Sequence, residues 1–177
     1  MSYPVPRLSA VLLLLLAPLL LASLASAAET PVPRPITHED VWLMKRPGAL
    51  AASLDGKWFV VGVTEPSYED DQRRSDLWIV PSDGSAAPRR LTTGRGSEGD
   101  PVFSADSTRL AFSAKREDDD SAQIYLLDLA GGEAQRVTSW PGGAKSPRFS
   151  PDGRALLFVG VTHPGAVTDE DNRKAAA

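Results

Sequence analysis

The chain has 177 residues, a formal net charge of −4 at neutral pH and no cysteine. An acidic balance without a cluster of Lys or Arg argues against a nucleic-acid partner. The lack of cysteine excludes disulfides, thiolate chemistry and zinc–thiolate sites.

The first segment, residues 1–27, predicts a secretory signal peptide. Met1 to Arg7 carries one positive charge, Leu8 to Leu24 is an uncharged run of mainly Leu and Ala, and Ala25-Ser26-Ala27 supplies the small residues of a cleavage site. A retained transmembrane anchor is the alternative, which Pro18 disfavours because it interrupts the run. We therefore expect an exported protein, periplasmic or secreted, that is not bound to the membrane after cleavage.

Residues 28–47 predict a lead-in segment with a short helical turn. Glu29 to Pro35 is rich in proline and too polar to pack, so it should be extended. Thr37 precedes His38-Glu39-Asp40 and has the side chain of a helix N-cap, with acids in the first turn. Pro47 limits this helix to one or two turns.

From residue 48 onward, short apolar runs bounded by Gly, Pro, Asp and Ser recur in a constant order. Asp55, Asp106 and Asp152 hold the same place in the repeat, at spacings of 51 and 46 residues. The runs that correspond are Ala52 to Val61, Phe103 to Phe112 and Phe149 to Phe158; then Asp76 to Val80 and Gln123 to Leu127; then Arg90-Leu91-Thr92 and Arg136-Val137-Thr138. Repeats of about 40 to 50 residues with four strands each predict β-propeller blades.

The middle repeat predicts the strands of one blade. A first strand enters a tight turn at Ala105-Asp106-Ser107, where a short acceptor side chain can bond the backbone two residues on. The second strand is an apolar run, as expected of a strand buried between blades. The fourth is polar, which suits an exposed edge. The predicted strands are Asp100 to Ser104, Leu110 to Lys115, Ile124 to Leu129 and Arg136 to Thr138.

The predicted fold is therefore all-β, a partial β-propeller of two full four-stranded antiparallel blades and half of a third. The blades occupy residues 48–93, 94–139 and 140–177, and the last of these ends in an acidic loop tail. Each blade buries its faces only against its neighbours. We therefore expect an open stack of sheets with exposed edges and marginal stability.

Three segments resemble a known protein family. The opening run Ile36 to Gly48 looks like that of the bacterial prolyl oligopeptidase-type serine peptidases, which include secreted dipeptidyl and acylaminoacyl peptidases. Asp76 to Pro81 and Ala111 to Arg116 are similar to their N-terminal β-propeller. The resemblance extends from Pro35 to the C-terminus. TolB-type periplasmic propellers share the Ser-x-Asp-Gly turn, so this turn alone does not separate the two families.

The resemblance implies a propeller that caps an α/β-hydrolase domain with a Ser, Asp and His triad, and that admits oligopeptides rather than folded proteins. No Gly-x-Ser-x-Gly nucleophile motif occurs in the chain; the nearest string, at residues 95–99, has Arg95 in place of the first Gly. His38 and His163 are the two histidines, and neither has an evident serine partner. We therefore predict no catalytic, cofactor-binding or metal-binding residue, and no activity of this chain alone.

Three functional hypotheses follow. The first is the N-terminal propeller fragment of a secreted prolyl oligopeptidase-like serine peptidase, whose partners are peptide substrates or a hydrolase domain of the parent protein. The second is a stand-alone TolB-like periplasmic protein-interaction module. The third is a truncated product without a stable fold. The segment Ile36 to Gly48 favours the first.

Two kinds of motif suggest ligand binding. Gly94-x-Gly96-x-x-Gly99 matches a dinucleotide fingerprint, but Asp100-Pro101 and a strand follow it instead of a helix, so we predict a connection between blades.

The second kind of motif is a cluster of consecutive acidic residues. Such clusters do not have the alternating spacing of a Ca²⁺ loop, which favours solvated loop tips. An acidic rim that attracts cationic peptides is the alternative. The acidic clusters are Glu69-Asp70-Asp71, Glu117-Asp118-Asp119-Asp120 and Asp169-Glu170-Asp171.

Aromatic residues raise the question of stacking on a sugar or peptide. Trp78 and the corresponding Tyr125 lie inside predicted strands, so they should pack between blades. The stretch Trp140-Pro141-Gly142-Gly143 reads as a connection with no ligand assigned to it. His38 lies beside the predicted helix start and should be a surface residue.

Overall fold

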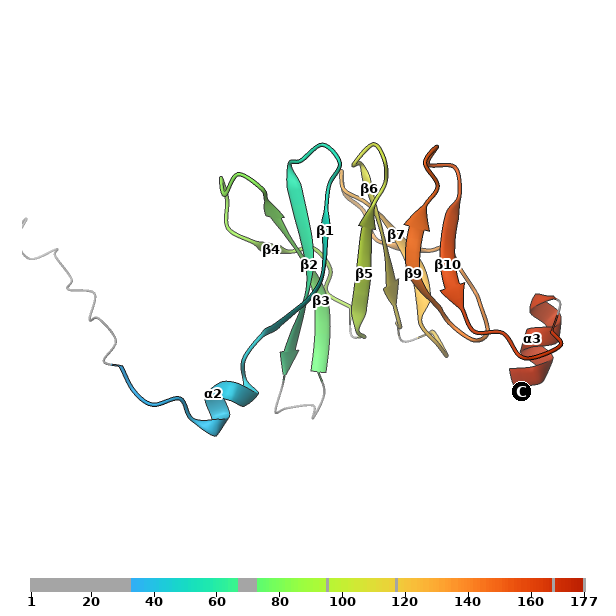
Figure 1. Ribbon diagram of the computed structural model, residues 1–177, viewed down its shortest axis with the longest axis horizontal. Helices are drawn as coiled ribbons and strands as arrows, with labels where there is room; N and C mark the ends of the chain where they lie inside the picture. Colours follow the sequence, from blue (N-terminus) through green and yellow to red (C-terminus); the bar gives the residue numbers. More distant parts are fainter. Residues whose placement is uncertain (1–32, 67–72, 95, 117, 167, 177) are drawn as a thin grey trace, which may run out of the picture. The chain divides into compact units, whose positions relative to one another are not determined.

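The sheets of this protein are each built from strands that follow one another in the sequence. The computed structural model describes residues 33–66, 73–94, 96–116, 118–166 and 168–176. Residues up to Ile36 form a separate unit from Thr37–Ala177, and the sheets belong to the second unit. Figure 1 shows three antiparallel sheets in the order of the chain.

The first two sheets have four strands in the orders β1-β2-β3-β4 and β5-β6-β7-β8, and the third pairs β9 with β10. Adjacent strands are antiparallel throughout. The strands are β1 (Arg46–Ala52), β2 (Trp58–Pro66), β3 (Arg73–Pro81), β4 (Arg89–Arg90), β5 (Glu98–Phe103), β6 (Arg109–Ala114), β7 (Gln123–Asp128), β8 (Gln135–Arg136), β9 (Ala144–Phe149) and β10 (Leu156–Gly160). The predicted all-β fold of four-stranded antiparallel sheets is confirmed. The blade boundaries after residues 93 and 139 lie between sheets and stay predictions.

The turn between the first two strands of each sheet is held by one serine and one aspartate. Ser104 donates its hydroxyl to Asp106 at 2.6 Å, and the same carboxylate accepts the Thr108 backbone N–H at 3.1 Å. Ser53 with Asp55, and Ser150 with Asp152, repeat both bonds at the same distances. The repeated tripeptide therefore forms the same Asx-type turn three times.

The residue after each turn aspartate adopts a left-handed conformation. Gly56 and Gly153 have φ of 71° and 67°, which costs glycine nothing. Ser107 has φ of 58° at the corresponding place in the second sheet. Its hydroxyl accepts the Asp55 N–H at 3.2 Å, which links this turn to that of the first sheet.

Apolar side chains alternate along the strands and fill two clusters, one on each side of the second sheet. Between the first and second sheets lie Val60, Leu77, Ile79, Phe103, Leu110, Phe112, Ala114, Tyr125 and Leu127. Between the second and third lie Ala111, Ile124 and Ala144, with Val102, Leu126, Trp140, Phe149, Leu156 and Phe158 around them. The second sheet is thus buried on both faces, which agrees with the burial of every residue of β6 after Arg109.

Helix α2 (His38–Trp42) begins where the sequence predicts. Thr37 accepts the Asp40 N–H at 3.2 Å, and the Asp40 carboxylate accepts the Thr37 N–H at 2.8 Å, which completes a capping box. The helix ends after one turn and a half, before Pro47.

The C-terminal tail differs from the prediction. It was expected to be an acidic loop, but Asp169–Ala176 forms helix α3. Thr168 and Asp171 exchange the hydrogen bonds of a capping box, and acids at the start with Arg173 and Lys174 in the last turn suit the helix dipole. Local capping thus favours a helix in a segment that lacks an apolar face.

Candidate functional site

The first strand of each sheet packs across the sheet before it. Strand β5 contacts β1, β2 and β3 of the first sheet, and β9 contacts β5, β6 and β7 of the second. Since β1, β5 and β9 are also edge strands of their own sheets, the three first strands follow one another along one edge of the stack. We call this edge the inner edge.

A β-bulge shapes the inner edge in each sheet. The register of β5 against β6 shifts between Gly99 and Val102, and Asp100 there has φ of 51°. Ser146 has the same φ at the corresponding place in β9. A bulge re-aims the side chain of the extra residue. In the second sheet the residue so placed is a carboxylate.

Asp100 joins the second sheet to the third. Its Oδ2 accepts hydrogen bonds from the Ser113 hydroxyl at 3.2 Å, the Ser146 N–H at 3.2 Å and the Ser146 hydroxyl at 3.4 Å. Three donors from two sheets converge on one oxygen, which makes Asp100 a clamp between neighbouring first strands.

A pocket of about 510 Å³ opens beside this clamp. We call it the inner-edge pocket. Most of its walls are Gly, Ala and Ser, and its charged side chains are Glu98, Asp100, Lys115 and Lys145, of which both lysines are exposed. Small side chains, hydrogen-bonding groups and charges of both signs line the pocket. Such a lining suits an extended peptide backbone better than an apolar ligand.

The described residues do not assemble a hydrolytic centre. Ser113, the buried serine at the pocket, donates its hydroxyl to Asp100 and to the Gly99 carbonyl. No serine hydroxyl in the described part of the chain is hydrogen-bonded to a histidine ring, whereas nucleophilic catalysis by serine needs such a base. His38 is exposed on α2, and the His163 N–H donates to Asn172 on α3 at 2.9 Å. Nor do the described residues gather three His, Cys, Asp or Glu side chains able to hold a metal ion.

The glycine-rich motif forms the connection into the second sheet. Strand β5 begins at Glu98, inside the motif, so a strand and not a helix N-terminus follows this loop, and no helix N-terminus is there to bind a pyrophosphate. Gly96 is required for another reason: a Cβ there would overlap the carbonyl oxygen of Lys115. Gly142 approaches the Val161 carbonyl in the same way before the third sheet.

The acidic clusters do not all behave as expected. Glu69-Asp70-Asp71 lies outside the described residues. In the second cluster Asp118 and Asp120 are exposed, but the prediction of a solvated tip is wrong for Asp119, which is 6% exposed. Asp171 of the third caps helix α3 instead of lying in a loop.

Asp119 is buried because three donors compensate its charge. It accepts the Tyr125 hydroxyl at 2.7 Å, the Arg116 N–H at 3.0 Å and Arg136 Nη1 at 2.7 Å. Burial by itself raises the pKa of this carboxyl, but these hydrogen bonds and the Arg136 charge outweigh burial and lower the pKa. Local sequence gives no signal for this, because the donors lie up to 17 positions away.

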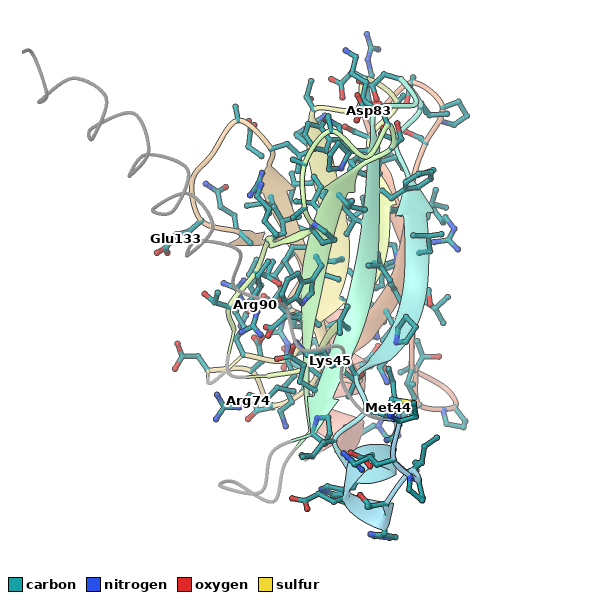
Figure 2. All side chains as sticks on the ribbon, turned by 90° about the vertical axis from the view of Figure 1, so that its left-hand side faces the viewer. Met44, Lys45, Arg74, Asp83, Arg90 and Glu133 are labelled. Carbon is teal, nitrogen blue, oxygen red and sulfur yellow. The ribbon has the colours of Figure 1, made fainter. Side chains whose placement is uncertain are left out.

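The aromatic residues are structural, with one difference from the prediction. Tyr125 packs between sheets, stacked on Phe112 at 6.0 Å. Trp78 alternates with the buried Leu77 and Ile79 and so lies on the outward face of the first sheet. There its ring is 5.5 Å from Lys45 Nζ and 5.3 Å from the Arg90 guanidinium, and Figure 2 shows both cations on that face.

Trp140 has a structural role that the sequence left open. Its indole N–H donates to the Val161 carbonyl at 2.9 Å, and its ring meets Phe158 edge-on at 5.8 Å. Gly160 lies so close that a Cβ there would be 2.7 Å from the indole nitrogen. The connection at Trp140 is therefore attached to the third sheet through this side chain, and the indole ring is not free to stack on a ligand.

Two buried carboxyl groups were missed by the sequence analysis. Asp76 on β3 and Glu98 on β5 are 4% and 3% exposed. One feature of the sequence could have indicated the burial of Asp76: it corresponds to Gln123 in the next repeat. An acid in one repeat and an amide in the next indicate a position where a polar side chain is hydrogen-bonded inside the protein.

No helix in the described ranges is long and apolar enough to cross a membrane.

No family model matches the chain. In sequence it is 35% identical over 128 residues to an uncharacterized peptidase, YuxL, of Bacillus subtilis, an alignment that covers 63% of this chain and 19% of YuxL. It is 32% identical over 124 residues to dipeptidyl-peptidase 5 of Porphyromonas endodontalis, covering 70% and 18%. A TolB homolog of Chlorobium chlorochromatii is 42% identical over 80 residues, covering 41% and 18%. The chain thus spans about a fifth of the length of the relatives that it matches.

Solved structures share the fold. A putative TolB from Agrobacterium tumefaciens aligns with a TM-score of 0.52 and 27% identity, over 67% of this chain and 39% of that one. The β-propeller domain of the trilobed protease from Pyrococcus furiosus aligns with a TM-score of 0.53 and 19% identity, over 66% and 34%. The fold is therefore that of propeller blades, and the resemblance to the propeller parts of prolyl oligopeptidase-type peptidases and of TolB is confirmed.

Proposed function

We propose that this chain is the N-terminal propeller portion of an exported serine peptidase of the prolyl oligopeptidase type. The observation that carries the proposal is the similarity to two peptidases over 63% and 70% of the chain. The chain itself supplies no nucleophile motif, so the hydrolytic step belongs to a hydrolase domain of the parent protein.

In this proposal the propeller limits which substrates reach the catalytic residues. When stacked sheets close into a ring, their first strands surround a central channel. The alignment of β1, β5 and β9 along the inner edge supports such a channel. The small, polar walls of the inner-edge pocket suit a peptide in extended conformation. Such a channel would admit peptides and exclude folded proteins.

Export is part of the proposal. The uncharged run Leu8 to Leu24 and the small residues Ala25-Ser26-Ala27 support cleavage after residue 27. Secretion into the medium or the periplasm is then expected. N-terminal sequencing of the protein recovered outside the cytoplasm tests this step, and a mature N-terminus at Met1 would contradict it.

Sequencing the DNA that follows the codon for Ala177 tests the peptidase proposal. We expect it to encode a Gly-x-Ser-x-Gly motif. The purified product of the whole frame should release fragments from short peptides but leave folded proteins intact. Replacement of the motif serine by Ala should abolish release and serves as the control. A frame that adds repeats and stops without the motif contradicts the proposal.

A second candidate is a stand-alone TolB-like interaction module. The 42% identity to the TolB homolog of Chlorobium chlorochromatii favours it, although this match covers only 41% of the chain. The same reading-frame experiment separates the two candidates, since a module of this kind binds proteins and lacks the nucleophile motif.

A further inference from the structure

Two carboxyl groups are buried where the first sheet meets the second. Asp76 follows Ser75 on β3, and Glu98 follows Ser97 at the start of β5. Ser75 and Ser97 form a parallel β-bridge that ties the two sheets together at this point. We call Asp76, Thr92, Glu98 and Arg116 the first junction.

The charge of Glu98 is only partly compensated. Thr92 donates a side-chain hydrogen bond to it, and Arg116 Nη2 lies 3.5 Å from its Oε1. Its Oε2 accepts no hydrogen bond from any residue that the structure describes. The backbone at Gly94 covers the carboxyl so closely that a Cβ there would be 2.8 Å from Oε1. A carboxylate in this position is poorly solvated.

Asp76 is buried too, but it alternates with Leu77 and so lies on the same side of β3 as Trp78, and the charges that act on it come from the first sheet. Arg90 Nη1 on β4 lies 3.3 Å from its Oδ2, while its Oδ1 accepts no hydrogen bond from the described residues. Glu65 on β2 and Arg74 on β3 are the other charged groups that act on it. Glu65 is itself paired with Lys45 at 2.6 Å and with Arg90 at 2.7 Å. Arg90 is therefore shared between two carboxylates.

Burial shifts the pKa of both carboxyls upward, toward the protonated form. Burial raises the pKa of Glu98 more than Thr92 and Arg116 lower it, and the charge of Asp76 raises it further. Burial likewise raises the pKa of Asp76 more than Arg90 lowers it, with Glu65 adding to the rise. A raised pKa in the folded state means that stability is full below the ordinary carboxyl pKa and falls as the pH rises through the folded-state pKa.

The contact between the second and third sheets offers an internal comparison. Gln123 corresponds to Asp76 there, and Ala144 to Glu98. The Gln123 side-chain oxygen accepts from the Thr138 hydroxyl at 2.8 Å and from the Trp140 N–H at 2.9 Å. Its nitrogen donates to the Trp140 carbonyl at 2.8 Å and to Ser121 at 3.2 Å. We call this contact the second junction.

The two junctions share a framework and differ in their ionisable groups. The Thr138 hydroxyl accepts the Ile124 N–H at 2.8 Å, just as the Thr92 hydroxyl accepts the Leu77 N–H at 3.0 Å. In the second junction the threonine donates to Gln123, the neutral counterpart of Asp76, whereas in the first it donates to Glu98, whose counterpart is the apolar Ala144. The fold therefore accepts uncharged residues at both positions. The carboxyl groups of the first junction are thus not needed for the fold, and what they add is a response to protons.

We propose that the first junction is a pH-responsive joint: Glu98, with the buried charge of Asp76 near it, takes up a proton from solvent in mild acid and holds the first two sheets together more firmly, whereas the second junction does not respond. Protonation removes buried negative charge, and it gives each carboxyl an O–H with which to donate a hydrogen bond.

Urea unfolding of the full chain between about pH 5 and pH 8 tests the proposal. The unfolding equilibrium constant of the unaltered chain should rise with pH, by up to about tenfold per unit and per carboxyl inside the titration window. The double variant Glu98→Gln, Asp76→Asn should lose most of this dependence. Asp106→Asn is the matched control and should keep it, because the pKa of Asp106 is lowered to about 2 and its charge is constant in this range.

Two further measurements do not depend on the double variant. Gln123→Glu places a carboxyl in the second junction, opposite the Trp140 carbonyl, and should add a pH dependence of the same sign. In the unaltered chain, the side-chain ¹³C signal of Glu98 should titrate above the ordinary glutamate value. A Glu98 signal that titrates at or below that value, or an unchanged slope in a folded double variant, overturns the proposal.

Discussion

Tyr125 donates its hydroxyl hydrogen to Asp119 at 2.7 Å and so fastens the loop before β7 to the core of the second sheet. The same carboxylate pairs with Arg136 on β8 at 2.7 Å. Arg116 completes the group, since it gives its backbone N–H to Asp119 and holds its guanidinium 4.4 Å from the Tyr125 ring centre. One buried acid therefore connects three separate segments.

This network makes Asp119 the most sensitive residue of its cluster. Replacing it by Ala leaves the Tyr125 hydroxyl without a partner and Arg136 without its carboxylate, so Asp119→Ala should lower the free energy of unfolding by about 3 kcal/mol. Asp118→Ala and Asp120→Ala are matched controls in exposed positions and should each cost under about 0.5 kcal/mol. Urea unfolding measures all three, and equal losses would show that the network does not stabilise the sheet.

The repeated turns should weaken in acid. Hydrogen bonds from Ser104 and Thr108 lower the pKa of Asp106 to about 2. A lowered folded-state pKa gives stability that is present above the ordinary value and is lost as the pH falls toward the folded-state value. The unfolding midpoint should therefore fall between about pH 4 and pH 2, and Asp106→Asn should flatten that fall. Ser104→Ala, which removes the strongest donor, should flatten it too; profiles parallel to the parent would contradict the prediction.

Glycines at three places should differ in their tolerance of a methyl group. Gly96→Ala forces a Cβ into the Lys115 carbonyl, so it should cost about 3 kcal/mol or more. Gly153→Ala meets no atom but keeps φ near 67°, which should cost about 1 to 2 kcal/mol. Gly99→Ala has open space and an ordinary φ, and it serves as the control with little effect. Thermal unfolding should rank the variants in this order, and a Gly96→Ala variant as stable as the control would refute the close approach.

Leucines on corresponding strands of the second and third sheets should contribute unequally. Leu110 is fully buried between the first and second sheets, so Leu110→Ala should cost about 2 to 5 kcal/mol. Leu157, one position further along the corresponding strand of the third sheet, is 61% exposed, and Leu157→Ala should cost under about 1 kcal/mol. The comparison is made by urea unfolding of the 177-residue chain, and similar losses would mean that the face with Leu157 is covered in solution.

The strand order and the turns were predictable because they depend on short-range patterns. Spacings of 51 and 46 residues between Asp55, Asp106 and Asp152 place the same serine–aspartate turn in each sheet. Apolar runs then give the second and third strands to within one or two residues of β6 and β7. The tail was misjudged, since its helix depends on the Thr168 cap rather than on an apolar period.

The candidate site was predictable only in part. The sequence excluded a serine nucleophile motif, and it placed the glycine-rich loop between sheets. It did not indicate the Asp100 clamp, because the donors Ser113 and Ser146 are 13 and 46 positions away. Contacts of that separation follow from how sheets stack.

By itself, then, the sequence determined how many strands form, in what order they pair, and which tripeptide turns them. Only the tertiary structure decided which charges are buried. Asp119 and Asp120 are neighbours in one acidic run, yet one is 6% exposed and the other is solvated. Backbone turns are set by neighbours along the chain, whereas the solvation of a carboxylate is set by the donors and sheets that surround it in space. For Asp76, Glu98 and Asp119 those surroundings come from other strands and their connections.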